Sequence, residues 1–183
     1  MSVQLFTISD SFIRQLSQID SRVLSNHENK RLHKRPYIGF LIQLGRFDYF
    51  LPLSSPDSTD YIEGKVRPST RTILRRFDKD NDFIGKILLN NRIPVLLSQV
   101  TKIQIPKKQP VGIEDRNYIN LLLKERKWIS SHISLIIKNS KIIYQQKKNE
   151  TNLEYFNNSK KPNYLSATVD FHKLEAYILS LSS

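Results

Sequence analysis

Five residues that can bind and activate a phosphate lie in two short segments of the chain. Lys34, Arg35 and Tyr37 end a basic segment, and Ser54 and Ser55 follow a later apolar stretch. Cations and hydroxyl donors directed at a phosphate stabilise the charge that develops when the 2′-hydroxyl of an RNA attacks its own backbone. The same residues also fit a basic loop beside a strand end, whose serines only cap the backbone. The residue types alone leave both interpretations open.

A predicted β-hairpin would bring the two segments together. Residues 34–57 read KRPYIGFLIQLGRFDYFLPLSSPD, with strand-forming residues on both sides of Gly45 and Arg46. A Gly-X pair favours a two-residue type II′ turn, which would pair Leu44 with Phe47. Because residues directly opposite share a sheet face, one face is then entirely apolar or aromatic and predicts core. Its members are Ile38, Phe40, Ile42, Leu44, Phe47, Tyr49, Leu51 and Leu53.

The open end of this hairpin is where the candidate residues would meet. In the predicted register Tyr37 lies opposite Ser54, next to Arg35 and Ser55. Pro36 has no N–H and would fall at a hydrogen-bonded pair, so the pairing should end there. A cation, a phenol and two hydroxyls would therefore lie where the backbone leaves the sheet.

The composition points to a polyanionic partner. The chain has 183 residues and a formal net charge of +12, which favours nucleic acid first and an anionic membrane surface second. The predicted C-terminal helices carry mixed charge without a basic face beside a Trp/Phe face, which argues against membrane binding. The absence of cysteine excludes thiol chemistry, Cys-ligated zinc and disulfides. With no secretory signal and no long apolar run, we expect a single soluble domain over residues 1–183 that is cytoplasmic.

The sequence predicts neither a metal nor a cofactor. The four histidines form no HxH or HExxH pattern, and the aspartates at 78, 80 and 82 lack the glycine and glutamate of a calcium loop. No Walker A or GxGxxG sequence is present. Asp57, Asp60 and Glu63 fall in one polar loop without an apolar frame, so we expect ordinary solvation of these carboxylates.

The hydrophobic periodicity predicts an α+β fold with a compact, twisted, mostly antiparallel sheet of about six strands flanked by helices. Besides the hairpin, strands are expected at residues 5–8, 69–77, 83–89, 93–97 and 100–105. Helices are expected at residues 10–19, from 112 to about 139 with a break near 130–131, and at 171–181. Residues 145–162 are interpreted as a mobile polar loop.

The N-terminal half resembles the ToxN/AbiQ family of type III toxin–antitoxin endoribonucleases. The order and spacing of several blocks carry the resemblance, which extends from Leu5 to about Leu97. The blocks are LFTIS at residues 5–9, RPYIG at 35–39, Tyr49, PLSSP at 52–56 and IPV at 93–95.

This resemblance implies a fold similar to the Kid/MazF toxins and metal-independent, sequence-selective RNA cleavage that leaves a 2′,3′-cyclic phosphate and a 5′-hydroxyl. The implied partner is a repeat-containing, pseudoknotted RNA antitoxin, which the toxin processes and which inhibits it. The implied role is abortive phage infection in a bacterium. A non-catalytic basic RNA-binding module is the alternative.

The family's catalytic basic residue falls on Arg35, and its hydroxyl pair falls on Ser54 and Ser55. Two positions depart from the family pattern, because Asp57 replaces a frequent lysine and Phe12 replaces an early helix tyrosine. The family's basic contribution is therefore expected from Lys34 or from an arginine further along the chain, and Lys34 or Tyr37 is expected to handle protons. The further basic residues expected to bind RNA are Lys30, Arg31, Arg67, Arg71, Arg75, Arg76, Lys107 and Lys108.

Overall fold

The structure is a computed structural model that describes residues 3–24, 37–106, 112–157 and 160–181. The helices are α1 (Asp10–Ile19), α2 (Ile113–Lys148) and α3 (Phe171–Leu181). The strands are β1 (Leu5–Ile8), β2 (Ile38–Leu44), β3 (Phe47–Ser54), β4 (Tyr61–Ile62), β5 (Lys65–Val66), β6 (Ile73–Phe77), β7 (Phe83–Leu88), β8 (Ile93–Val95) and β9 (Val100–Lys102). Short 3₁₀ turns are η1 (Ser58–Asp60), η2 (Leu89–Asn91), η3 (Leu97–Gln99), η4 (Glu154–Phe156) and η5 (Asn163–Leu165).

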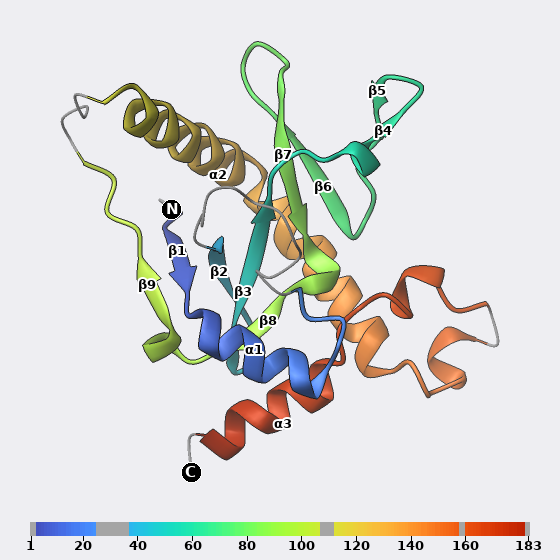
Figure 1. Cartoon of the computed structure of the whole chain (residues 1–183). Helices are drawn as coiled ribbons and strands as arrows, with labels where there is room; N and C mark the ends of the chain where they lie inside the picture. The colour runs from blue at the N-terminus through green and yellow to red at the C-terminus, as the bar shows by residue number, and fades with distance from the viewer. Residues whose placement is uncertain (1–2, 25–36, 107–111, 158–159, 182–183) are drawn as a thin grey trace.

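The main sheet has seven strands in the order β6-β7-β3-β2-β1-β9, and β8 also pairs with β3. Its strand pairs are antiparallel, and β4 and β5 form a separate small hairpin beside β6 (Figure 1). Helix α2 runs behind the sheet, while α1 and α3 lie at its lower end in this view. The predicted α+β class and the mostly antiparallel sheet are confirmed.

The central hairpin has the predicted turn and register. Leu44 pairs with Phe47, and the pairing continues to Gly39 and Pro52. Gly45 has a φ of +62°, which the first position of a type II′ turn requires and which glycine adopts without steric cost.

The open end of the hairpin differs from the prediction. The β2–β3 pairing stops at Gly39 and Pro52, so the expected pair of Tyr37 with Ser54 does not form. Beyond this point Ile38 pairs with β1, whereas Ser54 pairs with β7 on the opposite edge of β3. Because the sheet twists, β2 follows β1 and β3 follows β7 at this end, so β2 and β3 separate from each other.

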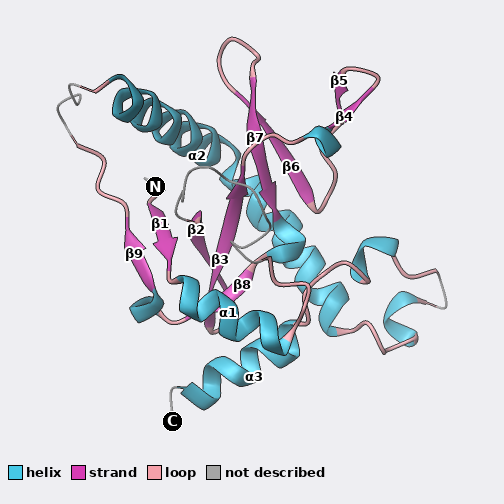
Figure 2. Cartoon of the chain, viewed as in Figure 1, coloured by secondary structure: helices cyan, strands magenta, loops and turns pink. Residues whose placement is uncertain are grey.

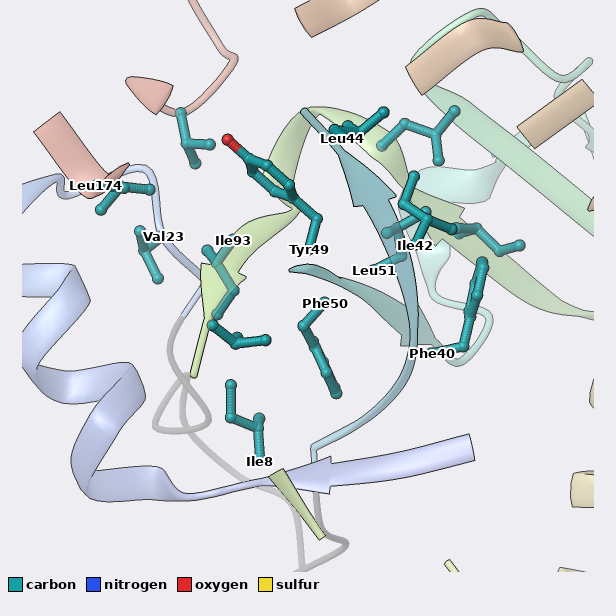
Figure 3. Packing of buried hydrophobic residues seen from close by; sticks show 14 of the residues in the cluster. Ile8, Val23, Phe40, Ile42, Leu44, Tyr49, Phe50, Leu51, Ile93 and Leu174 are labelled. Atoms are coloured by element: carbon teal, nitrogen blue, oxygen red, sulfur yellow. The ribbon is translucent and has the colours of Figure 1, made fainter. Parts of the chain in front are cut away.

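Both faces of β3 are buried at its centre. Tyr49 and Phe50 leave the strand in opposite directions, Phe50 toward Ile8 (Figure 3), and both are fully buried. The ring of Phe50 lies 2.5 Å from where a Cβ on Gly39 would be, so glycine is needed at that position. The prediction placed only the Tyr49 face in the core. The second face was missed because it carries the polar Asp48 and Ser54 together with Phe50.

Several element boundaries were predicted wrongly. Helix α2 continues without a break to Lys148, because the Ser131 hydroxyl donates to the Trp128 carbonyl at 2.9 Å and stays within the helix. Strand β6 begins at Ile73 rather than at residue 69, since the Ser69 and Thr70 hydroxyls accept backbone N–H groups in a turn. Helices α1 and α3 are confirmed, and the Ser9 hydroxyl caps α1.

A buried polar cluster joins α2 and α3 to the sheet. Glu175 accepts hydrogen bonds from Tyr49 at 2.5 Å and Tyr144 at 2.7 Å, and it pairs with Lys148 at 2.6 Å. Burial, followed by the bond to Glu175, raises the pKa of Tyr49. The cluster fixes the C-terminal helices against β3. Among the described helices, none is both long and apolar enough to cross a membrane.

Candidate functional site

Three polar side chains form a row across one face of the sheet. Arg75 on β6 pairs with Lys86 on β7, and Lys86 pairs with Ser54 at the end of β3. Residues directly opposite share a face, so all three side chains project to the same side. The chain then leaves the sheet through Ser55, which is exposed, and enters the loop that leads to β4 (Figure 2).

Two aspartates of this loop are fixed to the row. Lys86 Nζ lies 2.7 Å from Asp57 Oδ2 and 2.7 Å from Asp60 Oδ2, and Arg75 Nη2 lies 3.0 Å from Asp60 Oδ1. Asp60 is completely buried. The expected solvation of Asp60 is therefore wrong, because two cations and the Asp57 backbone N–H replace water. These bonds hold the loop after the serine pair against the sheet.

The backbone of Ser54 is fixed from the other face. Arg76 donates from Nη2 to the Ser54 carbonyl at 3.4 Å and is fully buried. Gly85 on β7 has a φ of +138°, and a Cβ there would lie 2.4 Å from the Ser54 carbonyl oxygen and 2.6 Å from Arg76 Nη2. Only glycine allows β7 to approach so closely. The position of Ser54 is therefore determined by the strand pairing, Arg76 and Gly85 together.

Tyr37 lies on the same side of the sheet as Ser54. Its ring stacks on Phe50 with centroids 5.8 Å apart and an interplanar angle of 20°. Phe50 and Ser54 are four residues apart on β3, and alternate residues of a strand share a face. The structure thus brings Tyr37 and Ser54 to one side, although not by the predicted pairing, and Ser55 follows at the exposed point where the chain leaves β3.

The predicted basic residues separate into three groups. Arg67 and Arg71 are exposed. Arg75 and Arg76 are buried and engaged by Asp60 and Glu125, so they lie inside the fold rather than on its surface, where we had expected them to bind RNA. The residues outside the described part of the chain are Lys30, Arg31, Lys34, Arg35, Lys107 and Lys108.

The sequence reasoning missed two residues that build the site. Lys86 is a lone cation in the strand FIGKIL, and Gly85 precedes it. A glycine inside a strand pattern indicates a bulge or a close backbone approach. This signal marks Gly85 as a point of close approach, although it does not name Ser54 as the partner. Lys86 gives no such signal, because its partners come from a loop far away in the sequence.

The arrangement offers hydroxyl groups rather than free cations. Lys86 and Arg75 are offset by Asp57 and Asp60, so they contribute little net charge toward a phosphate. Among the described residues, no group of three or more His, Cys, Asp or Glu side chains could hold a metal ion. Positive charge for a bound phosphate must therefore come from exposed arginines or from the basic segment before Tyr37.

The Asp57 carboxylate should make the stability of the fold depend on pH. Burial acts to raise the pKa of Asp57, but hydrogen bonds from Lys86 and Thr59 outweigh it and hold the pKa below its ordinary value. The unfolded chain then takes up the proton first as the pH falls. We expect the melting temperature to be steady above about pH 5 and to fall below about pH 4.

Thermal melting of Asp57→Asn across this range measures the effect, with the exposed Asp80→Asn as the matched control. Asp57→Asn should lessen the fall at low pH, and Asp80→Asn should not. Equal slopes in the two variants would show that the bond between Asp57 and Lys86 does not contribute.

Comparison with known proteins identifies the family. A family model described as "Toxin ToxN, type III toxin-antitoxin system" matches residues 4–179. The chain belongs to the ToxN toxin family. This confirms the resemblance seen in the sequence and extends it over the C-terminal helices.

Two curated relatives of this ToxN-family chain are endoribonucleases. Endoribonuclease ToxN of Bacillus thuringiensis subsp. kurstaki is 30% identical over 139 residues, which span 76% of this chain and 66% of that protein. Endoribonuclease AbiQ of Lactococcus lactis subsp. lactis is 26% identical over 179 residues, which span 96% of this chain and 87% of AbiQ.

A solved structure shares the whole fold. It comes from work on type III toxin–antitoxin systems and selective toxin inhibition by a non-coding RNA pseudoknot. It superposes with a TM-score of 0.74 at 26% identity and covers 100% of this chain and 99% of its own. The predicted fold class therefore agrees with the family.

Proposed function

We propose that this ToxN-family chain is an endoribonuclease toxin of a type III toxin–antitoxin system. Its active site lies at the end of β3, where exposed Ser55 follows Ser54 and where Tyr37 lies on the same side of the sheet as Ser54. The observation that carries the proposal is that Arg76, Gly85 and the pairing with Lys86 all fix the backbone at this hydroxyl pair. Ordinary capping serines would not require such support.

The proposed reaction needs no metal. The 2′-oxygen of one ribose forms a bond to the neighbouring phosphorus, and the bond from phosphorus to the 5′-oxygen of the next nucleotide breaks. The products are a 2′,3′-cyclic phosphate and a 5′-hydroxyl. The hydroxyls of Ser54 and Ser55 donate to the non-bridging oxygens, and Arg35 stabilises their charge. Lys34 or Tyr37 transfers protons to or from the two reacting oxygens.

We assign the two buried arginines a positioning role rather than contact with the RNA backbone. Arg76 positions the Ser54 backbone, and Arg75 holds the loop through Asp60. Contacts to the RNA backbone then fall to exposed or undescribed cations. These are Lys30, Arg31, Arg67, Arg71, Lys107 and Lys108.

The proposed partners are target RNAs and an RNA antitoxin with repeats and a pseudoknot. The antitoxin would be processed by the toxin and would inhibit it. A positively charged chain without cysteine suits an RNA partner in a bacterial cytoplasm, where abortive phage infection would take place.

The test is direct cleavage by the purified wild-type protein. Single-stranded RNAs of mixed sequence are incubated in EDTA, and the product ends are identified by mass spectrometry. We expect cuts at defined sequences, cyclic phosphate ends and no inhibition by EDTA. Intact RNA bound in a salt-sensitive manner would overturn the enzyme in favour of a non-catalytic binding module. Inhibition by EDTA would overturn the metal-free reaction.

A further inference from the structure

A cleft of about 530 Å³ opens between the β4–β5 hairpin and β6. Ile62, Pro68 and Ile73 provide apolar lining, and the buried Arg75 and Lys86 lie among its deeper residues. Figure 1 shows the β4–β5 hairpin beside β6. Thr59, Ile62 and Thr70 of the lining are exposed, so the cleft is reached from outside. Its volume falls within the range of small-molecule sites in proteins.

The charges of the cleft favour a neutral occupant. Lys86 and Arg75 are matched by Asp57 and Asp60, which leaves exposed Arg67 as the additional cation of the lining. A phosphate would gain little from such a balanced floor. A flat, mostly apolar group with a hydrogen-bond acceptor suits the lining better.

One buried donor beneath the cleft has no hydrogen-bond partner in the described part of the chain. Arg75 uses Nη1 for the Pro68 carbonyl at 2.8 Å and Nη2 for Asp60 at 3.0 Å. Its Nε is buried and has no hydrogen-bond partner among the described residues. This donor lies beneath the floor, so the polar lining that is open to a bound group includes the exposed Arg67 and Thr70.

The cleft adjoins the proposed active site. Lys86 lines the cleft and pairs directly with Ser54, so their side chains share one sheet face. Thr59 and Asp60 also line it, and they follow Ser55 closely in the chain. An RNA strand held at the two serines would therefore extend past the mouth of the cleft.

We propose that this cleft binds the base of an unpaired nucleotide that flanks the cleaved bond and thereby sets the sequence preference of cleavage. The base lies between the aliphatic side chains, above the charge-paired Lys86 and Arg75. Arg67 at the rim contacts the same nucleotide. This inference rests on the proposed endoribonuclease function.

Ile62 is the residue to change, because its side chain is 49% exposed and its loss should not unfold the protein. Ile62→Ala is compared with the wild type on a cleaved RNA and on copies that carry one abasic nucleotide at each position near the cut. Leu97→Ala, at an apolar residue that is 64% exposed and does not line the cleft, is the matched control. Melting curves check that each variant is folded.

At one flanking position the abasic change should lower the wild-type kcat/KM about tenfold, within the range of one bound base. On the intact RNA, kcat/KM of Ile62→Ala should already be lowered by most of this factor. The abasic change at that position should then lower it little further. Leu97→Ala should behave as the wild type.

If the kcat/KM losses from Ile62→Ala and from the abasic nucleotide add at every position, the cleft proposal is overturned. The proposed endoribonuclease function then still stands. If the wild type cleaves no RNA, the proposed function fails instead. Equilibrium binding of the same intact and abasic RNAs then decides the cleft proposal, which is overturned if the wild type and Ile62→Ala discriminate between them equally.

Discussion

Replacing Glu125 with glutamine should lower the free energy of unfolding by about 3–5 kcal/mol, because it leaves a buried cation without its counter-charge. Arg76 Nη1 lies 2.9 Å from Glu125 Oε1, and the two side chains are 0% and 8% exposed. Nη1 nevertheless makes no hydrogen bond of good geometry. The pair is therefore held by charge rather than by a directed bond, and glutamine, which has nearly the same volume, removes only the charge.

Chemical denaturation of Glu125→Gln measures the loss. The exposed Glu114→Gln, in the first turn of the same helix, is the control and should cost no more than about 1 kcal/mol. The double variant Arg76→Met with Glu125→Leu removes both charges and should recover most of the stability. A loss below about 1 kcal/mol in Glu125→Gln would show that Arg76 does not depend on this partner.

This ion pair also contacts the proposed active site. Arg76 joins α2, through Glu125, to the backbone carbonyl of Ser54. The helix behind the sheet and the serine pair at the end of β3 are thus linked by one buried side chain. A variant at Glu125 should therefore lower RNA cleavage more than its melting temperature alone would predict.

The hairpin could be predicted from sequence because local signals agree there. Gly45 sets the turn, and the alternation of apolar residues sets the register, so that a slip of one residue would expose the core. The periodicity of apolar residues likewise predicted α1 and α3. Each of these depends on residues that are close together in the chain.

The buried polar groups could not be predicted in this way. Asp60 lies in a loop of polar residues, and nothing near it in sequence shows that Arg75 and Lys86 will cover it. Likewise the arginines of β6 alternate between opposite faces, and only the fold shows that both faces are covered there. A net charge of +12 led us to assign several arginines to RNA contacts. The fold uses at least two of them internally.

Ser55→Ala should lower kcat for RNA cleavage about 100- to 1,000-fold, the effect of removing one donor from a charged transition state. Ser55 is exposed at the point where the chain leaves β3, so alanine there disturbs no packing. KM should change little if the hydroxyl contacts the phosphate mainly as charge develops. Ser54→Ala should also lower kcat. Ser54 is half-buried and its hydroxyl donates to the Ser55 carbonyl at 3.3 Å, so this variant also loses a structural contact.

Single-turnover cleavage of a defined RNA in EDTA separates this prediction from a loss of folding or binding. Ser98→Ala is the matched control, since Ser98 is exposed in η3 before β9, at the far edge of the sheet. RNA affinity and the melting temperature of Ser55→Ala should stay within the range of this control. Cleavage by Ser55→Ala at the control rate would remove Ser55 from the mechanism. It would then leave Tyr37 and the basic segment before it to carry the reaction.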